Sequence, residues 1–218
     1  MTQEFQKRLV SSIILITICF FIIFEGSVLF NLFLLFCFLI TSYEWHMMSK
    51  KKFYYIFGYI FLIVSFLSVY SLRNDVNEVS FFLFLFIIIT CISTDIGGYI
   101  FGKIFKGPKL TKLSPNKTYS GVIGSYIMSL ISIYLLTENY NLIMNDSYQF
   151  TIQLFFLILI TSTVSQIGDI IISFFKRLSK LKDTGKIIPG HGGLLDRIDG
   201  MLFTFPVLYL VLSLSLLK

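Results

Sequence analysis

The chain has 218 residues, of which 56% are hydrophobic, 17% aromatic and only 14% charged. A soluble domain usually carries about 25% charged residues, so this composition excludes a water-soluble globular domain and makes lipid the expected solvent. The formal net charge of +6 points to nucleic acid, anionic lipid or phosphate-bearing substrates, and the position of the basic residues decides among them.

Seven apolar segments are long enough to cross a bilayer, which takes about 20 mostly apolar residues per helix. They cover residues 9–24, 27–43, 53–72, 79–101, 121–137, 150–172 and 199–217. Continuous apolar runs favour helices over the alternating strands of a membrane barrel. The sequence therefore predicts an all-α, polytopic transmembrane bundle. Its first two helices, joined only by Glu25 and Gly26, should form a tight hairpin.

Basic residues are concentrated in one of the two alternating sets of polar segments. The N-terminus and segments 44–52, 102–120 and 173–198 carry 16 of the 18 Lys and Arg residues, and the other set carries only Arg73 and Lys218. Because Lys and Arg near span ends mark the cytoplasmic side, we expect a cytoplasmic N-terminus and an external C-terminus. We divide the chain into three hydrophobic spans, 1–78, and a four-helix membrane domain, 79–218, which carries the long loops 102–120 and 173–198.

The fourth predicted span contains an acidic residue, Asp95, about two turns from its cytoplasmic end. An ionisable residue inside a span is costly and is a candidate for a functional role, here as a ligand or substrate contact. Gly98 and Gly102, in the same segment, have the small-xxx-small spacing that allows two helices to pack closely.

The first long loop, 102–120, holds candidate phosphate-binding residues. Thr118 or Ser120 can cap the following helix, whose N-terminal amides attract anions. Lys112 and Lys117 would flank this helix start, with Ser114 opening a Ser-Pro-Asn turn between them. The alternative is that the lysines of this loop only satisfy the positive-inside bias and contact anionic headgroups.

Three aspartates lie at the neighbouring ends of the last two predicted spans, where the loop 173–198 joins them. Asp196 and Asp199 are three residues apart and would share one helix face, and Asp169 lies near the end of the sixth span. Mg²⁺ prefers one or two carboxylates together with substrate phosphates. We therefore predict Asp169, Asp196 and Asp199 as metal ligands.

Basic residues are interleaved with these acids. Lys176, Arg177, Lys182 and Arg197 would neutralise a polyphosphate whose metal ion the acids hold, as phosphoryl-group transfer requires. Glycines on both sides of His191 allow the backbone to approach a ligand closely. The competing interpretation is a solvated charged face with His191 in an ordinary turn, but the joint pattern from Asp169 to Asp199 favours a functional site.

The second loop resembles the signature of phosphatidate cytidylyltransferases, also called CDP-diacylglycerol synthases. The resemblance rests on the pattern Lys176-Arg177, Lys182-Asp183, Pro189-x-His191-Gly192-Gly193-x-x-Asp196-Arg197-x-Asp199. Three further segments agree with the family pattern: Asp95 to Lys103, Ser114-Pro115-x-Lys117-Thr118 and Gln166-x-Gly168-Asp169. Together these matches cover about residues 90–205.

The resemblance implies transfer of the cytidylyl group of CTP to phosphatidate, giving CDP-diacylglycerol and pyrophosphate. It also implies Mg²⁺ as cofactor, with a monovalent cation such as K⁺ as an optional second ion, a homodimer in a bacterial-type inner or plasma membrane, an active site facing the cytoplasm and no nucleic-acid partner. The implied catalytic residues are Asp169, Lys176, Arg177, Asp196, Arg197 and Asp199. The implied substrate-binding residues are Asp95, Lys112, Ser114, Lys117, Thr118, Lys182, Asp183, His191, Gly192 and Gly193.

Some residues depart from the family pattern. Ile172 stands where the family usually places a glutamate, Tyr119-Ser120 replaces an aromatic–acidic or aromatic–amide pair, and the chain is short for the family. Two alternatives stay open at this point. One is a related CTP-dependent kinase of polyprenol or another lipid alcohol. The other is a transporter, which the intramembrane acids Asp95 and Asp169 suggest but which would be expected to show repeat symmetry.

Overall fold

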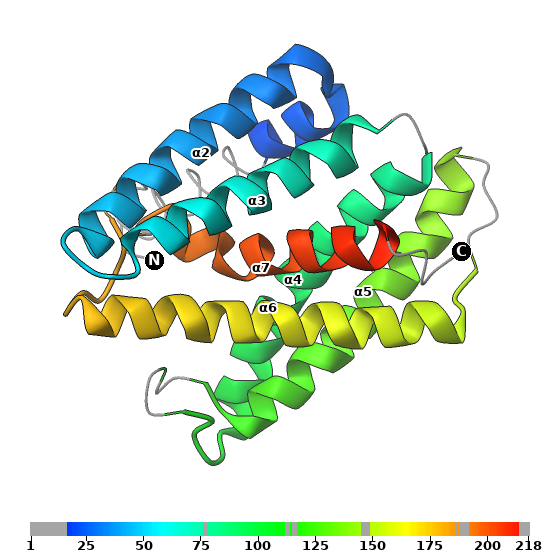
Figure 1. The fold of residues 1–218 in the computed structure, drawn as a ribbon. Helices are drawn as coiled ribbons and strands as arrows, with labels where there is room; N and C mark the ends of the chain where they lie inside the picture. Colours follow the sequence, from blue (N-terminus) through cyan, green and yellow to red (C-terminus); the bar gives the residue numbers. More distant parts are fainter. Residues whose placement is uncertain are drawn as a thin grey trace, which may run out of the picture.

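The computed structural model describes residues 17–75, 78–111, 114, 117–144, 149–185, 187 and 192–213. Within these ranges the regular secondary structure is helical and contains no β-strand, which confirms the all-α prediction for the described part. After helical residues 17–25 come α2 (Ser27–Ser49), α3 (Tyr55–Asn74), α4 (Glu78–Phe105), α5 (Tyr119–Met144), α6 (Ile152–Leu178) and α7 (Leu195–Ser213) (Figure 1).

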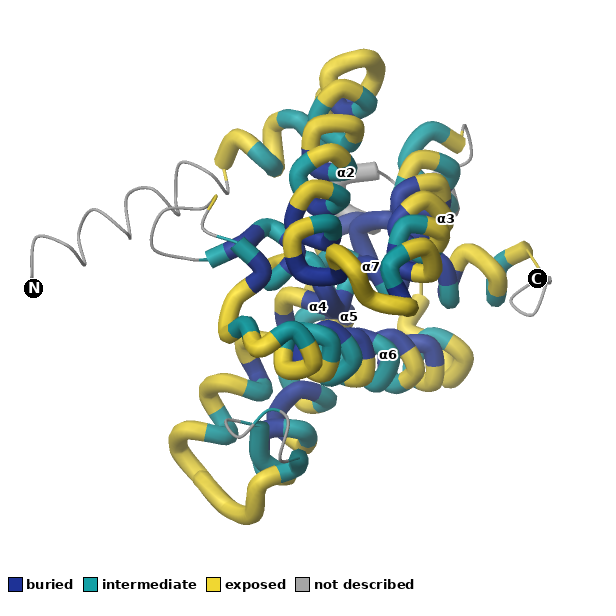
Figure 2. The backbone as a smooth tube through the Cα atoms, turned by 60° about the vertical axis from the view of Figure 1, so that its left-hand side comes forward, coloured by how far each residue is buried: buried dark blue, intermediate teal, exposed yellow. Residues whose placement is uncertain are grey.

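Five of these helices are long and apolar enough to cross a membrane. They are Ser27–Ser49, Tyr55–Asn74, Ser80–Phe105, Tyr119–Tyr140 and Ile152–Leu178, which match the second to sixth predicted spans. Many residues along these helices are exposed (Figure 2), and large apolar side chains are common among them, as expected for contact with lipid. The first predicted span, 9–24, is described only from residue 17. The helix α7 is not among the five and carries charged residues in its first turn, so the count of seven spans stays a prediction.

The predicted hairpin between the first two spans is present in the described residues. Helical residue 25 is followed by Gly26, whose φ of +66° favours glycine, and α2 begins at the next residue. The guanidinium of Arg73, at the end of α3, donates to the carbonyl oxygen of Ile23 from Nε at 3.0 Å and from Nη2 at 2.7 Å. Arg73 therefore supplies two hydrogen bonds to a carbonyl oxygen at the C-terminal end of helical residues 17–25.

The last helix, α7, lies inside the bundle between α3 and α6 and also contacts α2 and α4 (Figure 1). Pro206 interrupts its hydrogen-bond ladder, since proline lacks the N–H that would bond the carbonyl of Leu202. The hydroxyl of Ser65, from α3, donates to that carbonyl oxygen at 2.7 Å. A side chain from a neighbouring helix thus replaces the missing bond and ties α3 to α7.

The helices α4 and α5 pack closely because glycines meet at their contact. A Cβ atom added at Gly121 would lie 2.8 Å from the carbonyl oxygen of Gly98, and one at Gly98 would lie 2.9 Å from Oγ of Ser125. A Cβ at Gly102 would meet Oγ1 of Thr118 at 3.0 Å. The predicted packing role of Gly98 and Gly102 is confirmed, and this contact brings the start of α5 next to the end of α4.

The described parts of the two predicted sets of polar segments lie at opposite ends of the bundle. At one end, the hydroxyl of Tyr54 lies 2.9 Å from that of Ser179, which joins the α2–α3 turn to the end of α6. At the other end, Asn74 Nδ2 donates to Asn31 Oδ1 at 3.0 Å. The first of these ends, called the basic end below, carries the lysine-rich segments. The domain boundary at residue 78 is not tested by these contacts.

Candidate functional site

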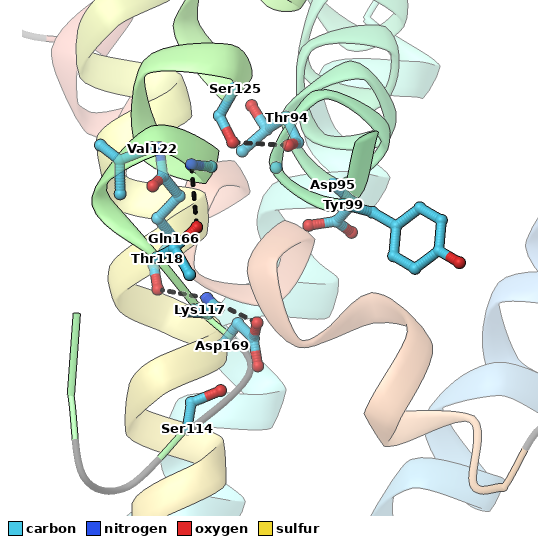
Figure 3. Close-up of a pocket in the computed structure, with 12 residues that line it drawn as sticks. Thr94, Asp95, Tyr99, Ser114, Lys117, Thr118, Val122, Ser125, Gln166 and Asp169 are labelled. Carbon is cyan, nitrogen blue, oxygen red and sulfur yellow. Dashed lines mark hydrogen bonds and ion pairs between the residues drawn. The ribbon is translucent and has the colours of Figure 1, made fainter. Parts of the chain in front are cut away.

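A polar pocket of about 230 Å³ lies at the basic end, where α4, α5 and α6 meet (Figure 3). Asp95 and Tyr99 line it from α4, Ser114 and Lys117 from the loop before α5, and Asp169 from α6. Four of these residues, Asp95, Ser114, Lys117 and Asp169, were predicted from sequence as site residues, and the fold brings them together from segments far apart in the chain.

An ion pair joins two walls of this pocket. Lys117 Nζ lies 2.6 Å from Asp169 Oδ2, and it also donates to the carbonyl oxygen of Gln166 at 3.2 Å (Figure 3). The two paired side chains are 23% and 29% exposed, so the ammonium and the carboxylate can both be reached from the pocket. The hydroxyl of Ser173 donates to the other oxygen of Asp169 at 3.3 Å.

The start of α5 holds Lys117 in position. The hydroxyl oxygen of Thr118 accepts a hydrogen bond from the amide of Gly121 at 3.1 Å, which confirms the predicted helix cap. The amide of Lys117 donates to the carbonyl oxygen of Ser114 at 3.1 Å and closes a turn directly before the cap. The predicted partner Lys112 lies outside the described residues.

The carboxyl groups of Asp95, Asp169 and Asp199 lie close enough to one another to interact electrostatically. Asp199, in the first turns of α7, is only 7% exposed, and its Oδ1 accepts from the amide of Gly200 at 2.8 Å. The positive charges of Lys117 and Arg197 also act on Asp95. This concentration of acids beside lysine and arginine suits a ligand that carries both phosphates and a cation.

Asp196 does not join this group. Its Oδ1 accepts from Lys176 Nζ at 2.7 Å, and its Oδ2 accepts from the amides of Thr184 at 2.8 Å and Gly193 at 3.2 Å. Burial acts to raise the pKa of this carboxyl, but the hydrogen bonds and the charge of Lys176 outweigh burial and lower the pKa below its ordinary value. Asp196 therefore holds the loop that precedes α7.

The expected set of metal ligands, Asp169, Asp196 and Asp199, is not gathered at one point. No group of three or more acidic, histidine or cysteine side chains that could hold a metal ion occurs in the described part of the chain. Asp196 stands in the first turn of α7, where its carboxylate accepts from the amide of Gly193 and points toward the loop before the helix. Asp169 faces Asp95 across the pocket instead, so two carboxylates line a cavity that phosphates could enter.

Glu44, which was not predicted from the sequence, holds the start of α7 in place. It lies in α2, is 1% exposed, and accepts hydrogen bonds from the amide of Leu194 at 3.0 Å, the amide of Leu195 at 2.7 Å and the hydroxyl of Thr184 at 3.1 Å. A carboxylate at a helix N-terminus is stabilised by the amides there. Its only sequence signal was an acid at the end of an apolar span.

The other predicted site residues that the structure describes do not line this pocket. Arg177 donates to the carbonyl oxygen of Leu181, and Lys182 and Asp183 are exposed on the loop after α6. Gly192 has a φ of +92° and Gly193 is buried, so both glycine positions are required by the backbone or by packing. Arg197 lines a second, apolar cavity. His191 lies outside the described residues.

The departures from the family pattern have structural explanations. Ile172 is 2% exposed in an apolar cluster with Trp45 and Leu195, so an aliphatic side chain fits its surroundings. Tyr119 is 54% exposed, and Ser120 donates to the carbonyl oxygen of Lys106, which fastens the loop start to α5.

Most of the chain is similar to known proteins. Residues 51–215 match the model of the cytidylyltransferase family. A phosphatidate cytidylyltransferase of Rickettsia typhi is 34% identical over 95% of this chain and 91% of its own length. That of Rickettsia prowazekii is 33% identical over 96% and 92%. That of Staphylococcus saprophyticus is 35% identical over 80% of this chain and 66% of its own length.

Proposed function

The chain belongs to the cytidylyltransferase family, and on that premise we propose that it transfers the cytidylyl group of CTP to phosphatidate in the membrane. The products are CDP-diacylglycerol and pyrophosphate. The single observation that carries the assignment of the site is the pocket in which Lys117 and Asp169 form an ion pair opposite Asp95.

The pocket would hold the phosphates of the nucleotide. Its volume of about 230 Å³ is below the range of roughly 300–1,000 Å³ for pockets that enclose a whole ligand, so it fits part of CTP. Lys117 would supply the positive side of this pocket. Ser114, in the loop before α5, and Thr118, which caps this helix, also line the pocket and would donate hydrogen bonds to phosphate oxygens.

A divalent cation fits the chemistry of the donors. Asp95 and Asp169 would repel a triphosphate unless a cation stood between them, and Mg²⁺ typically takes one or two carboxylates with phosphate oxygens. We therefore propose Mg²⁺ held by Asp169 with Asp95 or Asp199. When bound, the ion would neutralise charge on the phosphates. A second, monovalent cation such as K⁺ stays a prediction.

The reaction needs no nucleophile from the protein. An oxygen of the phosphatidate phosphate attacks the α-phosphorus of CTP, the bond from that phosphorus to the bridging oxygen breaks, and the β- and γ-phosphates leave as pyrophosphate. The protein contributes alignment and charge stabilisation. Lys117 would act on the CTP phosphates, and Arg197, at the neighbouring mouth of the apolar cavity, on the phosphate of the lipid. Lys176 would act indirectly, by holding Asp196 and the loop before α7.

The protein is integral to the membrane, and we propose that the basic end faces the cytoplasm, where CTP is available. The distribution of Lys and Arg supports this orientation. The homodimer expected from the family resemblance stays a prediction, and no interface is proposed for it.

Product analysis separates this function from the two alternatives. The purified chain, in detergent micelles with Mg²⁺, is given either phosphatidate or a polyprenol as the lipid substrate, with CTP labelled in the α- or the γ-phosphate. We expect the α-label in the lipid product and the γ-label in pyrophosphate. A γ-label in the lipid, with release of CDP, would instead indicate a lipid kinase. No labelled lipid from either substrate would leave the transporter alternative.

A further inference from the structure

A second cavity, of about 790 Å³, lies next to the polar pocket and is almost entirely apolar. Its walls come from helical residues 17–25 and from α2, α3, α4, α5 and α7, and the polar side chains that line it are Ser93, Ser132 and Arg197. No step of the phosphate chemistry described above requires an apolar cavity of this size.

The cavity runs along the helices from the basic end into the bundle. On α4 its lining residues extend from Ile96 to Phe84, a rise of about 18 Å, and on α7 from Arg197 to Phe205, about 12 Å. One leaflet of a bilayer has a hydrocarbon depth of about 15 Å, half of the roughly 30 Å core. The cavity therefore has the length of an acyl chain in one leaflet.

The far end of the cavity is closed by aromatic rings. The ring centroids of Phe84 and Phe205 are 5.6 Å apart, and those of Phe30 and Phe84 are 5.7 Å apart. All three side chains are at most 3% exposed, so they form a packed floor, called the aromatic floor below. Behind it, the guanidinium of Arg73 lies 5.6 Å from the ring centre of Phe30.

The near end of the cavity is charged and adjoins the polar pocket. Arg197 lines the cavity here, and its charge acts on Asp95, which lines the polar pocket. Ile96, beside Asp95 in sequence, lines the cavity, so α4 forms the boundary between the two spaces. An anionic headgroup at Arg197 would thus stand next to the bound nucleotide.

We propose that this cavity binds acyl chains of the phosphatidate substrate, and that the aromatic floor limits the length of chain that the enzyme accepts. The inference rests on the proposed function, because it names where the lipid of that reaction lies. An apolar cavity with a cation at one end complements an anionic lipid.

Ile88 offers a direct test, since it lines the cavity one helical turn above Phe84. In the variant Ile88→Trp, the larger side chain fills the part of the cavity next to the aromatic floor and shortens the cavity. The matched control is Ile131→Trp on α5, an identical substitution at a position that is 50% exposed and does not line the cavity. Each purified variant receives an equimolar mixture of dioctanoyl and dipalmitoyl phosphatidate with CTP and Mg²⁺. The product ratio then reports the ratio of kcat/KM values independently of the amount of folded enzyme.

We expect the ratio of dipalmitoyl to dioctanoyl product to fall about tenfold in Ile88→Trp, which corresponds to roughly two methylene groups forced out of the cavity. The ratio of Ile131→Trp should equal that of the unsubstituted chain. An unchanged ratio in Ile88→Trp would overturn the proposal. If this variant does not fold, Phe205→Leu is tested instead, because the smaller side chain lengthens the cavity at the aromatic floor. It should raise the ratio of distearoyl to dipalmitoyl product. An unchanged ratio would overturn the proposal. If the unsubstituted chain forms no CDP-lipid from either substrate, the proposed function itself fails.

Discussion

The carboxylate of Glu44, buried in α2, lies 2.7 Å from the amide nitrogen of Leu195, the first residue of α7. The two residues are 151 positions apart in the sequence. Through this contact an N-terminal helix holds the loop and helix start that carry Asp196, Arg197 and Asp199. Glu44 is therefore a positioning residue, which does not touch the proposed substrates.

The variant Glu44→Gln tests this role. The amide group keeps one acceptor oxygen but turns an NH₂ toward the backbone donors, and leaving a buried donor unpaired costs about 1–3 kcal/mol. We expect lower thermal stability and a kcat reduced about tenfold or more, with the protein still inserted in membranes. Glu138→Gln, an exposed position in α5 toward the opposite end, is the matched control and should behave as the unsubstituted chain. Equal activity and stability of both variants would contradict a positioning role for Glu44.

Lys117→Met removes the cation of the polar pocket while preserving the length of the side chain. Loss of one charged group that stabilises the transition state typically reduces kcat by about 100- to 1,000-fold. We expect a fall of this size in CDP-diacylglycerol formation, measured with α-labelled CTP. Lys109→Met is the control, because Lys109 is exposed on the same loop and does not line the pocket. A comparable loss in both variants would mean that the loop acts only through its overall charge.

Asp199→Asn should abolish turnover while the protein stays folded in the membrane. The substitution keeps the size of the side chain but replaces a buried carboxyl group, which lies close to Asp169 and Asp95, with an amide. Lys218→Ala, in the set of segments predicted to lie outside, should have no measurable effect. Turnover near the level of the unsubstituted chain in Asp199→Asn would show that this carboxylate has no part in the site.

Asp196 predicts a dependence of stability on pH. Because its pKa in the folded protein is below the ordinary value, the carboxylate stabilises the fold at neutral pH, and this contribution is lost as the pH falls through the folded-state pKa. We expect Asp196→Asn to lower Tm at pH 7, and the difference from the unsubstituted chain to shrink as the pH is lowered below the usual range of an aspartate. A difference in Tm that stays constant between neutral and acidic pH would contradict this role.

The sequence was sufficient for those features that depend on local pattern. Apolar runs predicted five helices that the structure contains, the glycines at 98 and 102 predicted a close helix contact, and Thr118 was predicted as a cap. Contacts between distant segments were not predictable in this way. The bond from Ser65 to the carbonyl left free by Pro206 depends on how α3 packs against α7.

The candidate site shows the same division. Sequence pattern indicated Lys117 and Asp169 separately, but only the packing of α5 against α6 makes them an ion pair. Helical spacing predicted a shared face for Asp196 and Asp199, whereas in the structure the amides of Thr184 and Gly193 donate to Oδ2 of Asp196 and Lys176 donates to Oδ1. Residue spacing predicts which side chains share a face of an isolated helix. It does not take into account hydrogen bonds from other segments that pack against the start of that helix.

A structure of the full chain with CTP and Mg²⁺ tests the central claim most directly. We predict density for the triphosphate in the pocket between α4, α5 and α6, with Lys117 Nζ within hydrogen-bonding distance of a phosphate oxygen and the cation against Asp169. Triphosphate bound elsewhere, for instance at the opposite end near Arg73, would contradict the account of the site.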